Sequence, residues 1–233
     1  MTDIFREVEE EVRRERFEKI WKQYGDYIIA AMAVIIIGTA GFLLWQRYQE
    51  NRRATASAEY DAAVQLASSN PVAAIGAFER IAATAPGGYA SLAKFAEADT
   101  LLITGERNRA VAVYESLGNG DESLIGSAAR VRAAWSIAEF APRPAIEKLV
   151  APLTQPSSPW RFAANEVLAY ADYREGGYAR AEKAFQALAT DPNAPRALKT
   201  RAAAMASLIR SGGEGNSGYV PPATTQAAPA PNP

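Results

Sequence analysis

Twenty consecutive residues without a formal charge, 27–46, constrain the fold of this chain more than any other feature. The segment reads YIIAAMAVIIIGTAGFLLWQ and lies between Asp26 and Arg47. At about 1.5 Å per residue, a helix of this length spans about 30 Å, the thickness of the hydrocarbon core of a bilayer. We therefore predict one membrane-spanning helix over residues 27–46. Aromatic residues, which prefer the level of the lipid headgroups, stand at both ends of it: Tyr24, Tyr27, Trp45 and Tyr48.

The surroundings of this segment differ from those of a cleavable signal peptide. A signal peptide has an apolar run of about 7–15 residues behind a short basic segment. Here 26 residues with eight acidic side chains precede the run. The small residues Ala54, Ala56 and Ala58 resemble a cleavage site, but the charged stretch RYQENRR separates them from the apolar run. We therefore predict an uncleaved signal anchor.

Basic residues near the span predict its orientation. Five lie within fifteen residues before the span and three lie within fifteen residues after it. An excess of basic residues marks the cytoplasmic side, and a long following domain is translocated largely regardless of its charge. In a bacterium, this pattern predicts a single-pass protein of the inner (plasma) membrane with a cytoplasmic N-terminus. The residues from about 50 onward are then expected in the periplasm.

The two ends of the chain predict different behaviour. Residues 1–26 carry two apolar stripes at helical spacing, with six basic and eight acidic side chains. We expect a cytoplasmic amphipathic lead-in helix, which either contacts a protein or simply leads into the span, in preference to binding anionic lipid. Residues 211–233 consist almost entirely of small and polar residues and proline. They cannot bury enough apolar surface to offset the entropy of ordering, so we predict a disordered Ala/Pro-rich tail. Residues 47–210 remain for a folded repeat domain.

A periodic pattern of small and large residues runs through residues 47–210. Four alanines are 35 or 36 residues apart, a large apolar residue follows each by four positions, and another alanine precedes each by twelve. Two antiparallel helices need a small side chain where their backbones approach and a large one a turn later. The four alanines are Ala74, Ala110, Ala145 and Ala181, their large partners are Phe78, Tyr114, Leu149 and Phe185, and the preceding alanines are Ala62, Ala98, Ala133 and Ala169.

Turn-forming residues stand where paired helices require turns, as at 104–106 and 175–177. Alternating strand patterns are absent, and good helix formers dominate. Residues 196–210 supply half of a further pair, which we expect to cover the last repeat. Pro152 is expected to end the second helix of the third pair early. We predict an all-α fold, in which a single N-terminal transmembrane helix precedes an α-solenoid of about four helical hairpins.

The segment EVLAYADYREGGYARAEKAFQALATDP, residues 166–192, resembles the tetratricopeptide repeat in its period and in its small and large positions. The other three copies follow the pattern less closely. With the short N-terminal helix, the single span and the repeat domain beyond it, the whole architecture resembles the YfgM-like family of ancillary Sec translocon subunits. This resemblance implies a tetratricopeptide-like α-solenoid. It also implies an inner-membrane protein that associates with Sec translocon subunits, periplasmic chaperones and exported client proteins.

In solenoids of this kind the first helix of each pair lines the concave face, which defines a candidate partner groove. The inward positions mix aromatic rings with both signs of charge, which suits an extended peptide or a partner's helix. The alternative for each residue is packing against the neighbouring helices, which is the more common outcome for a single apolar position. The candidates are Phe95, Asp99, Leu102, Ile103, Arg130, Ala134, Ile137, Glu166, Tyr170, Tyr173 and Arg174.

The composition argues against catalysis. The chain has no His and no Cys, which removes most metal-site patterns and the Ser/His and Cys/His nucleophile pairs. Acidic pairs such as Asp121-Glu122 have no accompanying base, Gly-rich phosphate loop or nucleophile elbow. A net charge of −1 does not provide the basic footprint of a nucleic-acid binder.

These absences predict no catalytic, cofactor or metal site, no nucleic-acid partner and no small-molecule substrate. We expect a non-enzymatic interaction scaffold at the export machinery. The alternative that the sequence leaves open is a coordinator of cell-envelope assembly or division that uses a repeat domain.

Overall fold

The computed structural model describes residues 3–120 and 123–212, with side chains from residue 21 onward except at 28 and 31. The chain divides into two compact units, Met1–Thr55 and Ala56–Pro233, and each is described by itself. Three predictions fall outside the described residues: the tail from residue 213 onward, Asp121-Glu122, and the apolar stripes before residue 21.

The first unit contains the N-terminal part of the long helix α1, Asp3–Ser69. Its apolar side chains are exposed, among them Val34, Ile37 and Leu44. The hydroxyl of Thr39 donates a hydrogen bond to the backbone carbonyl of Ile35, so this polar group is satisfied within the helix. Among the described residues, α1 is the one helix long and apolar enough to cross a membrane. The prediction of one long apolar N-terminal helix is confirmed.

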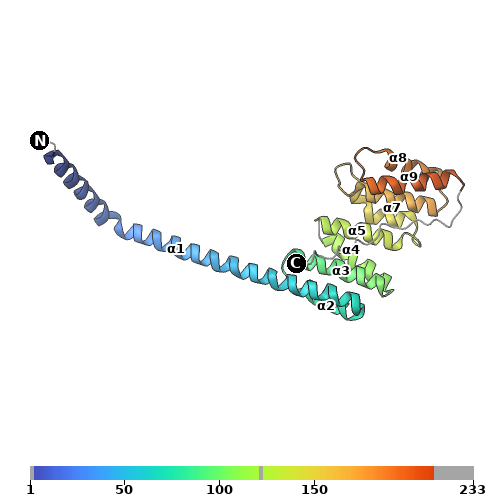
Figure 1. Cartoon of the computed structure of the whole chain (residues 1–233), viewed down its shortest axis with the longest axis horizontal. Helices are drawn as coiled ribbons and strands as arrows, with labels where there is room; N and C mark the ends of the chain where they lie inside the picture. Colours follow the sequence, from blue (N-terminus) through green and yellow to red (C-terminus); the bar gives the residue numbers. More distant parts are fainter. Residues whose placement is uncertain (1–2, 121–122, 213–233) are drawn as a thin grey trace, which may run out of the picture. The chain divides into compact units, whose positions relative to one another are not determined.

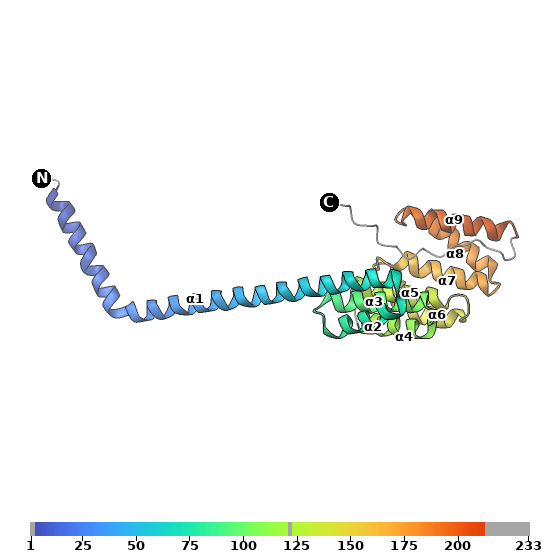
Figure 2. The same cartoon turned by 60° about the horizontal axis from the view of Figure 1, so that its bottom comes forward.

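The second unit is a stack of helices. Consecutive helices from α2 to α9 lie side by side (Figures 1 and 2), and α3 also contacts α5, α5 contacts α7, and α7 contacts α9. Alternate helices therefore form one layer of an all-α solenoid, as predicted. The helices are α2 (Pro71–Thr84), α3 (Gly88–Ile103), α4 (Arg107–Gly120), α5 (Leu124–Ile137), α6 (Arg143–Val150), α7 (Arg161–Arg174), α8 (Tyr178–Thr190) and α9 (Arg196–Arg210), with a short 3-10 helix, η1 (Ala151–Leu153), after α6.

Glycines form the turns inside two of the hairpins. Gly105 has a φ of 83° between α3 and α4, and Gly176 has a φ of 79° between α7 and α8. Residues with a Cβ atom rarely adopt this left-handed conformation, which explains why glycine stands at both turns. These turns fall at 104–106 and 175–177, where the sequence predicts them.

The pattern of small and large residues is confirmed for the second helices of three repeats, where these side chains are almost fully buried: Ala74 with Phe78, Ala110 with Tyr114, and Ala181 with Phe185. In the third repeat the prediction is wrong by one residue. Ile146 and Val150 are buried in α6, whereas Ala145 and Leu149 are only partly buried. The first repeat shows a similar shift, because Ala63 is buried in place of Ala62.

Prolines explain the shift in the third repeat. Pro142 is the N-cap of α6 and Pro144 follows in its first turn, so the two prolines fix where this helix begins and which face it buries. Pro152 then lies in η1, and α6 has only eight residues, compared with 14 in α2, 14 in α4 and 13 in α8. The third hairpin therefore has a short second helix, as its prolines predict.

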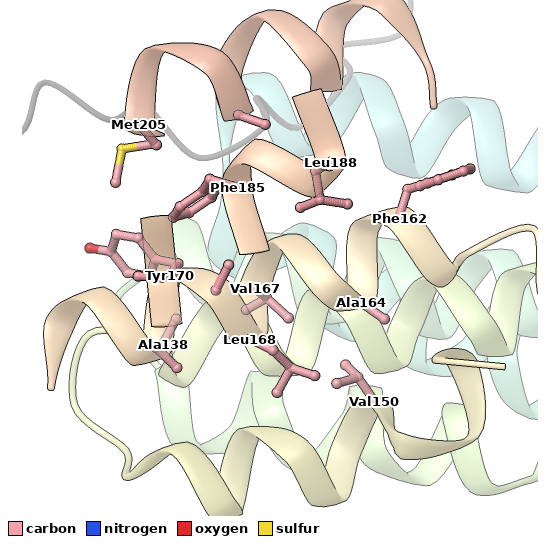
Figure 3. Close-up of a cluster of buried hydrophobic side chains, with 14 of the residues drawn as sticks. Ala138, Val150, Phe162, Ala164, Val167, Leu168, Tyr170, Phe185, Leu188 and Met205 are labelled. Atoms are coloured by element: carbon pink, nitrogen blue, oxygen red, sulfur yellow. The ribbon is translucent and has the colours of Figure 1, made fainter. Parts of the chain in front are cut away.

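Apolar side chains of α5 to α9 form the largest buried cluster (Figure 3). Leu198 and Met205 of α9 belong to it, together with Phe185 of α8 and Tyr170 of α7. Residues 196–210 thus cover the apolar surface of the last full repeat, as expected for the end of a repeat array.

Candidate partner-binding surface

Four of the predicted groove residues lie in the interior. Ala134, Glu166, Tyr170 and Tyr173 are each 8% exposed or less. Three of them belong to α7, which contacts α5, α6, α8 and α9 and has little free surface. The expectation that these four line an open groove is therefore corrected: they pack against neighbouring helices. The reason is that neighbouring helices, α9 among them, cover α7, and that α3, α4, α6 and α7 contact α5, where Ala134 lies. Positions counted along a single helix do not reveal this.

Glu166 forms a buried ion pair with Arg201 of α9. The Nε and Nη2 atoms of Arg201 donate to the two carboxylate oxygens of Glu166, both at 2.9 Å. The Glu166 side chain is 1% exposed, so the bidentate pair with Arg201 is needed to compensate for burying a carboxylate. The pair holds the last helix on α7 and is a structural contact.

Tyr170 reaches the preceding hairpin turn. Its hydroxyl donates a hydrogen bond to Oε1 of Glu139, and its ring lies 5.5 Å from that of Trp135. Burial, and then the Glu139 carboxylate, raise the pKa of Tyr170 above its ordinary value. The hydroxyl therefore stays protonated and serves as a donor that joins α7 to the end of α5.

Phe95 and Asp99 are partly exposed, and both contact Tyr114 of α4 in the same hairpin. The Tyr114 hydroxyl donates to Oδ1 of Asp99 at 2.6 Å, and Nη2 of Arg132 lies 3.3 Å from the same oxygen. The ring of Phe95 meets that of Tyr114 edge-on with centroids 5.4 Å apart. Burial, and then the Asp99 carboxylate, raise the pKa of Tyr114. Asp99 therefore links α3, α4 and α5.

Two predicted arginines bind backbone carbonyls at helix ends. Arg130 donates from Nε to the carbonyl oxygen of Gly118 and from Nη2 to Oδ1 of Asn119, both at 3.0 Å. Arg174 donates from Nη1 to the carbonyl oxygen of Glu139 at 3.1 Å. Cations at the carbonyl end of a helix satisfy acceptors that lack helical partners. These two side chains are thus engaged within the fold.

The remaining candidates, Leu102, Ile103 and Ile137, lie at the C-terminal ends of α3 and α5. Leu102 packs partly against the core, whereas Ile103 is 74% exposed. Ile137 lines a cleft of about 600 Å³ between the α3–α4 turn and the α5–α6 turn. We call it the turn-edge cleft, and its lining residues are Gly105, Glu106, Arg107, Asn108, Arg109, Ile137, Phe140 and Ala141.

An exposed aromatic and arginine pair marks the turn-edge cleft. Cζ of Arg107 lies 4.6 Å from the ring centroid of Phe140, which is 64% exposed. In the part of the chain that the structure describes, Arg107 has no carboxylate partner, whereas Arg109 pairs with Glu106 and with Glu79. Arginine and aromatic residues are enriched among the residues that dominate protein interfaces.

Sequence reasoning missed Arg107 and Phe140. Helical periodicity gives no information about residues in turns. The available signal was a large apolar side chain, Phe140, directly before the Ala-Pro at 141–142, because the residue before a proline is biased away from helix.

Within residues 3–120 and 123–212, no group of three or more His, Cys, Asp or Glu side chains is arranged to hold a metal ion. Two buried acidic residues of α7 have arginine partners within the fold: Glu166 pairs with Arg201, and Asp172 pairs with Arg143 and Arg180. The chemistry that these surfaces offer is recognition through shape, apolar contact and guanidinium groups.

A family model described as a tetratricopeptide repeat-like domain matches residues 18–149, more than half of the 233 residues. The match begins before the apolar segment and ends within α6. It therefore covers the first three repeats and does not reach 166–192, the segment with the clearest pattern. Neither the curated proteins nor the solved structures give a match.

Proposed function

The chain belongs to the tetratricopeptide repeat-like domain family, and from this premise we propose that it is an ancillary subunit of the Sec translocon that links export to periplasmic chaperones. Repeat folds of this family are typically non-catalytic scaffolds for protein binding. The observation that carries the proposal is the extent of the family match, since residues 18–149 include both the apolar segment and the repeat helices.

The anchor is proposed to remain uncleaved, and the packing of α1 supports this. The small residues that resemble a cleavage site, Ala54, Ala56 and Ala58, lie inside α1. Ala56 is 3% exposed and Ala63 is 2% exposed, and Tyr60 packs against Phe78 of α2 with ring centroids 5.9 Å apart. Cleavage at this point would cut a helix that contributes to the core of the first repeat.

We place the chain in the bacterial inner membrane, with residues 1–26 cytoplasmic, 27–46 in the bilayer and 47–210 periplasmic. The excess of basic residues before the span supports this orientation. Partner proteins are proposed to contact the turn-edge cleft, because Arg107, Ile103 and Phe140 supply an exposed combination of charge and apolar surface.

Protease treatment of intact spheroplasts tests the location. Digestion of the repeat domain from outside supports a periplasmic domain, and protection in intact spheroplasts followed by digestion after lysis contradicts it. Co-purification of the full chain in mild detergent tests the partners. Sec translocon subunits and periplasmic chaperones in the eluate support the proposal, whereas cell-wall synthases in their place would indicate a coordinator of envelope assembly.

A pair of matched variants tests the turn-edge cleft in the same experiment. Phe140→Ala removes the exposed ring beside Arg107, and we expect it to reduce recovery of the translocon subunits. Leu124→Ala is the control, because Leu124 is 66% exposed at the start of α5 and does not line the cleft. Equal recovery with both variants would remove the turn-edge cleft from the proposal.

A further inference from the structure

The short helix α6 leaves a second cleft, of about 510 Å³, over α7 and α8. Its apolar floor includes Phe162 and Leu168 of α7 and Leu188 of α8, whose side chains are shown in Figure 3. In the second and fourth repeats the second helix has 14 and 13 residues, whereas α6 ends after eight. The segment after η1 contributes Thr154 and Pro156 to the wall instead. We call this space the inter-repeat cleft.

One charged group of the inter-repeat cleft is fully engaged. Asp172 is 6% exposed, and its Oδ1 lies 3.0 Å from Nε of Arg143 and 3.2 Å from Nη2 of Arg180. Two guanidinium groups therefore neutralise this carboxylate. Because Arg143 belongs to α6 and Arg180 to α8, these ion pairs join both helices to α7. Asp172 does not make the cleft attractive to a cation.

Two other polar groups of the cleft remain available. Cζ of Arg161 lies 4.1 Å from the ring centroid of Phe162, and Nη1 donates to the carbonyl oxygen of Ser158 at 3.4 Å. Across the described ranges, Arg161 has no carboxylate partner, and the side-chain amide of Asn165 has no hydrogen-bond partner. The cleft thus combines an apolar floor, an amide that both donates and accepts, and a guanidinium without a counter-ion.

We propose that the inter-repeat cleft binds an extended segment of a partner protein that carries one large aliphatic side chain and a carboxylate within a few residues of it. The aliphatic side chain packs against Leu168 and Leu188. The amide of Asn165 donates to and accepts from one peptide unit, as a neighbouring strand would. The guanidinium of Arg161 binds the carboxylate. This inference rests on the proposed function only in requiring a protein partner.

Arg161 supplies the charge complementarity for a carboxylate. The carboxylate of Asp172 is paired with two guanidinium groups within the fold. Asp191, whose Oδ1 accepts a hydrogen bond from the backbone N–H of Asn193 at 2.8 Å, also lines the cleft, so we expect the partner's carboxylate to bind at Arg161 and not elsewhere in the cleft. Arg161 lies beside buried apolar surface, where a charge-assisted contact is stronger than in water.

Fluorescence anisotropy with the purified full chain in detergent micelles tests the proposal. The probes are labelled short peptides of Gly and Ser around one leucine, with a glutamate within a few residues of it. One matched set has lysine in place of the glutamate, and another has serine in place of the leucine. We expect the leucine and glutamate set to bind roughly ten- to a hundredfold more tightly than either matched set. Equal binding of the three sets would overturn the proposal.

Variants connect the binding to this cleft. Ala187→Phe places a ring in the cleft and is expected to abolish binding. Ser116→Phe, at the corresponding exposed position of α4, is expected to leave it unchanged. Arg161→Glu should weaken binding of the glutamate peptides roughly tenfold or more, and Arg161→Lys should weaken it less. Unchanged binding by Ala187→Phe, with circular dichroism showing a folded protein, would overturn the assignment to this cleft.

The source of the carboxylate is resolved by the chain end of the peptides. Amidated peptides that still bind indicate an internal acidic side chain, whereas binding of free-acid peptides alone indicates a partner's C-terminus. Either result supports the proposal that the inter-repeat cleft binds the peptide. The test is independent of the translocon. If the purified chain binds the peptides but Sec subunits do not co-purify with it, the binding assigned to the cleft stands and the proposed function is rejected.

Discussion

The second and fourth repeats place corresponding residues in different surroundings. Arg130 of α5 and Arg201 of α9 are 71 residues apart and occupy the same repeat position, but the side chains that they face differ. Glu166 of the fourth repeat meets Arg201 of the helix that follows this repeat, α9. In the second repeat the position equivalent to Glu166 is Phe95, and Arg130 of the next first helix, α5, instead binds the carbonyl oxygen of Gly118.

This difference explains why the same repeat position is buried in α7, at Glu166, and partly exposed in α3, at Phe95. A buried carboxylate in α7 requires a fixed partner from α9, so the last helix is held against it. Phe95, the equivalent residue of α3, is uncharged and needs no charged partner, and it remains partly exposed. This repeat position therefore decides whether the next first helix is held by an ion pair to a buried carboxylate, as in α7, or by apolar contacts and the partly exposed pair of Asp99 and Arg132, as in α3.

The largest expected effect comes from breaking the buried ion pair between Glu166 and Arg201. Arg201→Met leaves the carboxylate of Glu166 buried without its partner, and we expect a loss of about 3 kcal/mol in the free energy of unfolding. Urea unfolding of the full chain in detergent, followed by circular dichroism, measures this loss. The control is Arg210→Ala, because the Arg210 and Glu182 pair is exposed and should contribute less than about 1 kcal/mol.

The double variant Glu166→Leu with Arg201→Met separates charge from packing. Replacing both partners with apolar side chains removes the uncompensated charge, so we expect most of the lost stability to return. A double variant as unstable as Arg201→Met would contradict the role of the buried carboxylate.

The next effect exchanges a side chain between the two repeats. Phe185 occupies the position of Tyr114, 71 residues later. The acceptor of the Tyr114 hydroxyl is Asp99, and the equivalent position in α7 is Tyr170, whose ring offers no carboxylate. Phe185→Tyr therefore buries a hydroxyl without a strong acceptor, and we expect a loss of about 2 kcal/mol. Unchanged thermal unfolding of this variant would show that the hydroxyl finds another partner.

The reverse exchange, Tyr114→Phe, should cost less. It removes one hydrogen bond to Asp99, but Arg132 continues to pair with that carboxylate and Asp99 is partly exposed to water. We expect a loss of about 1 kcal/mol, measured by the same thermal unfolding. A loss larger than that of Phe185→Tyr would reverse the order that the two environments predict.

The spacing of small and large residues predicts where the helices of this chain lie better than it predicts which of their side chains are exposed. The spacing of alanines identified the hairpins, because backbone approach between helices requires small side chains at a fixed period. The same counting misplaced α6 by one residue, since Pro142 and Pro144 fix the start of that helix independently of the period.

The candidate site was harder to predict, for a physical reason. Whether Tyr170 or Glu166 is exposed depends on α9, which lies more than twenty residues away in sequence and covers α7 through tertiary contacts. Phe140 and Arg107 lie in or next to turns, where residue spacing has no structural period. The cleft residues Arg161 and Asn165 matter because α6 is short, and in the sequence Pro152 predicts only that this helix ends early.

The smallest expected effect concerns an acidic residue of α3 that has no counterpart in α7. Glu97 is buried where the equivalent position of α7 is Leu168. Burial, and then the neighbouring Glu79 carboxylate, raise the pKa of Glu97, although Arg109 and Lys94 act in the opposite direction. Because the pKa is higher in the folded state, the folded state binds the proton more tightly than the unfolded state does. The contribution of this group to stability is therefore fully present below its unfolded pKa and is lost as pH rises through the folded pKa.

Glu97→Gln sharpens this last comparison, because it keeps the shape of the side chain and removes its charge. We expect the variant to be slightly more stable than the parent chain at neutral pH and to lose that advantage as the pH falls through the range in which Glu97 becomes protonated. Thermal unfolding of both proteins across a pH series measures the difference. Glu79→Gln should give a smaller gain in the same direction, because Glu79 acts on Glu97 only through its charge and itself pairs with Arg109. A Glu97→Gln variant that is less stable than the parent at neutral pH would mean that the carboxylate of Glu97 stabilises α3 through Arg109 and Lys94 more than its burial costs.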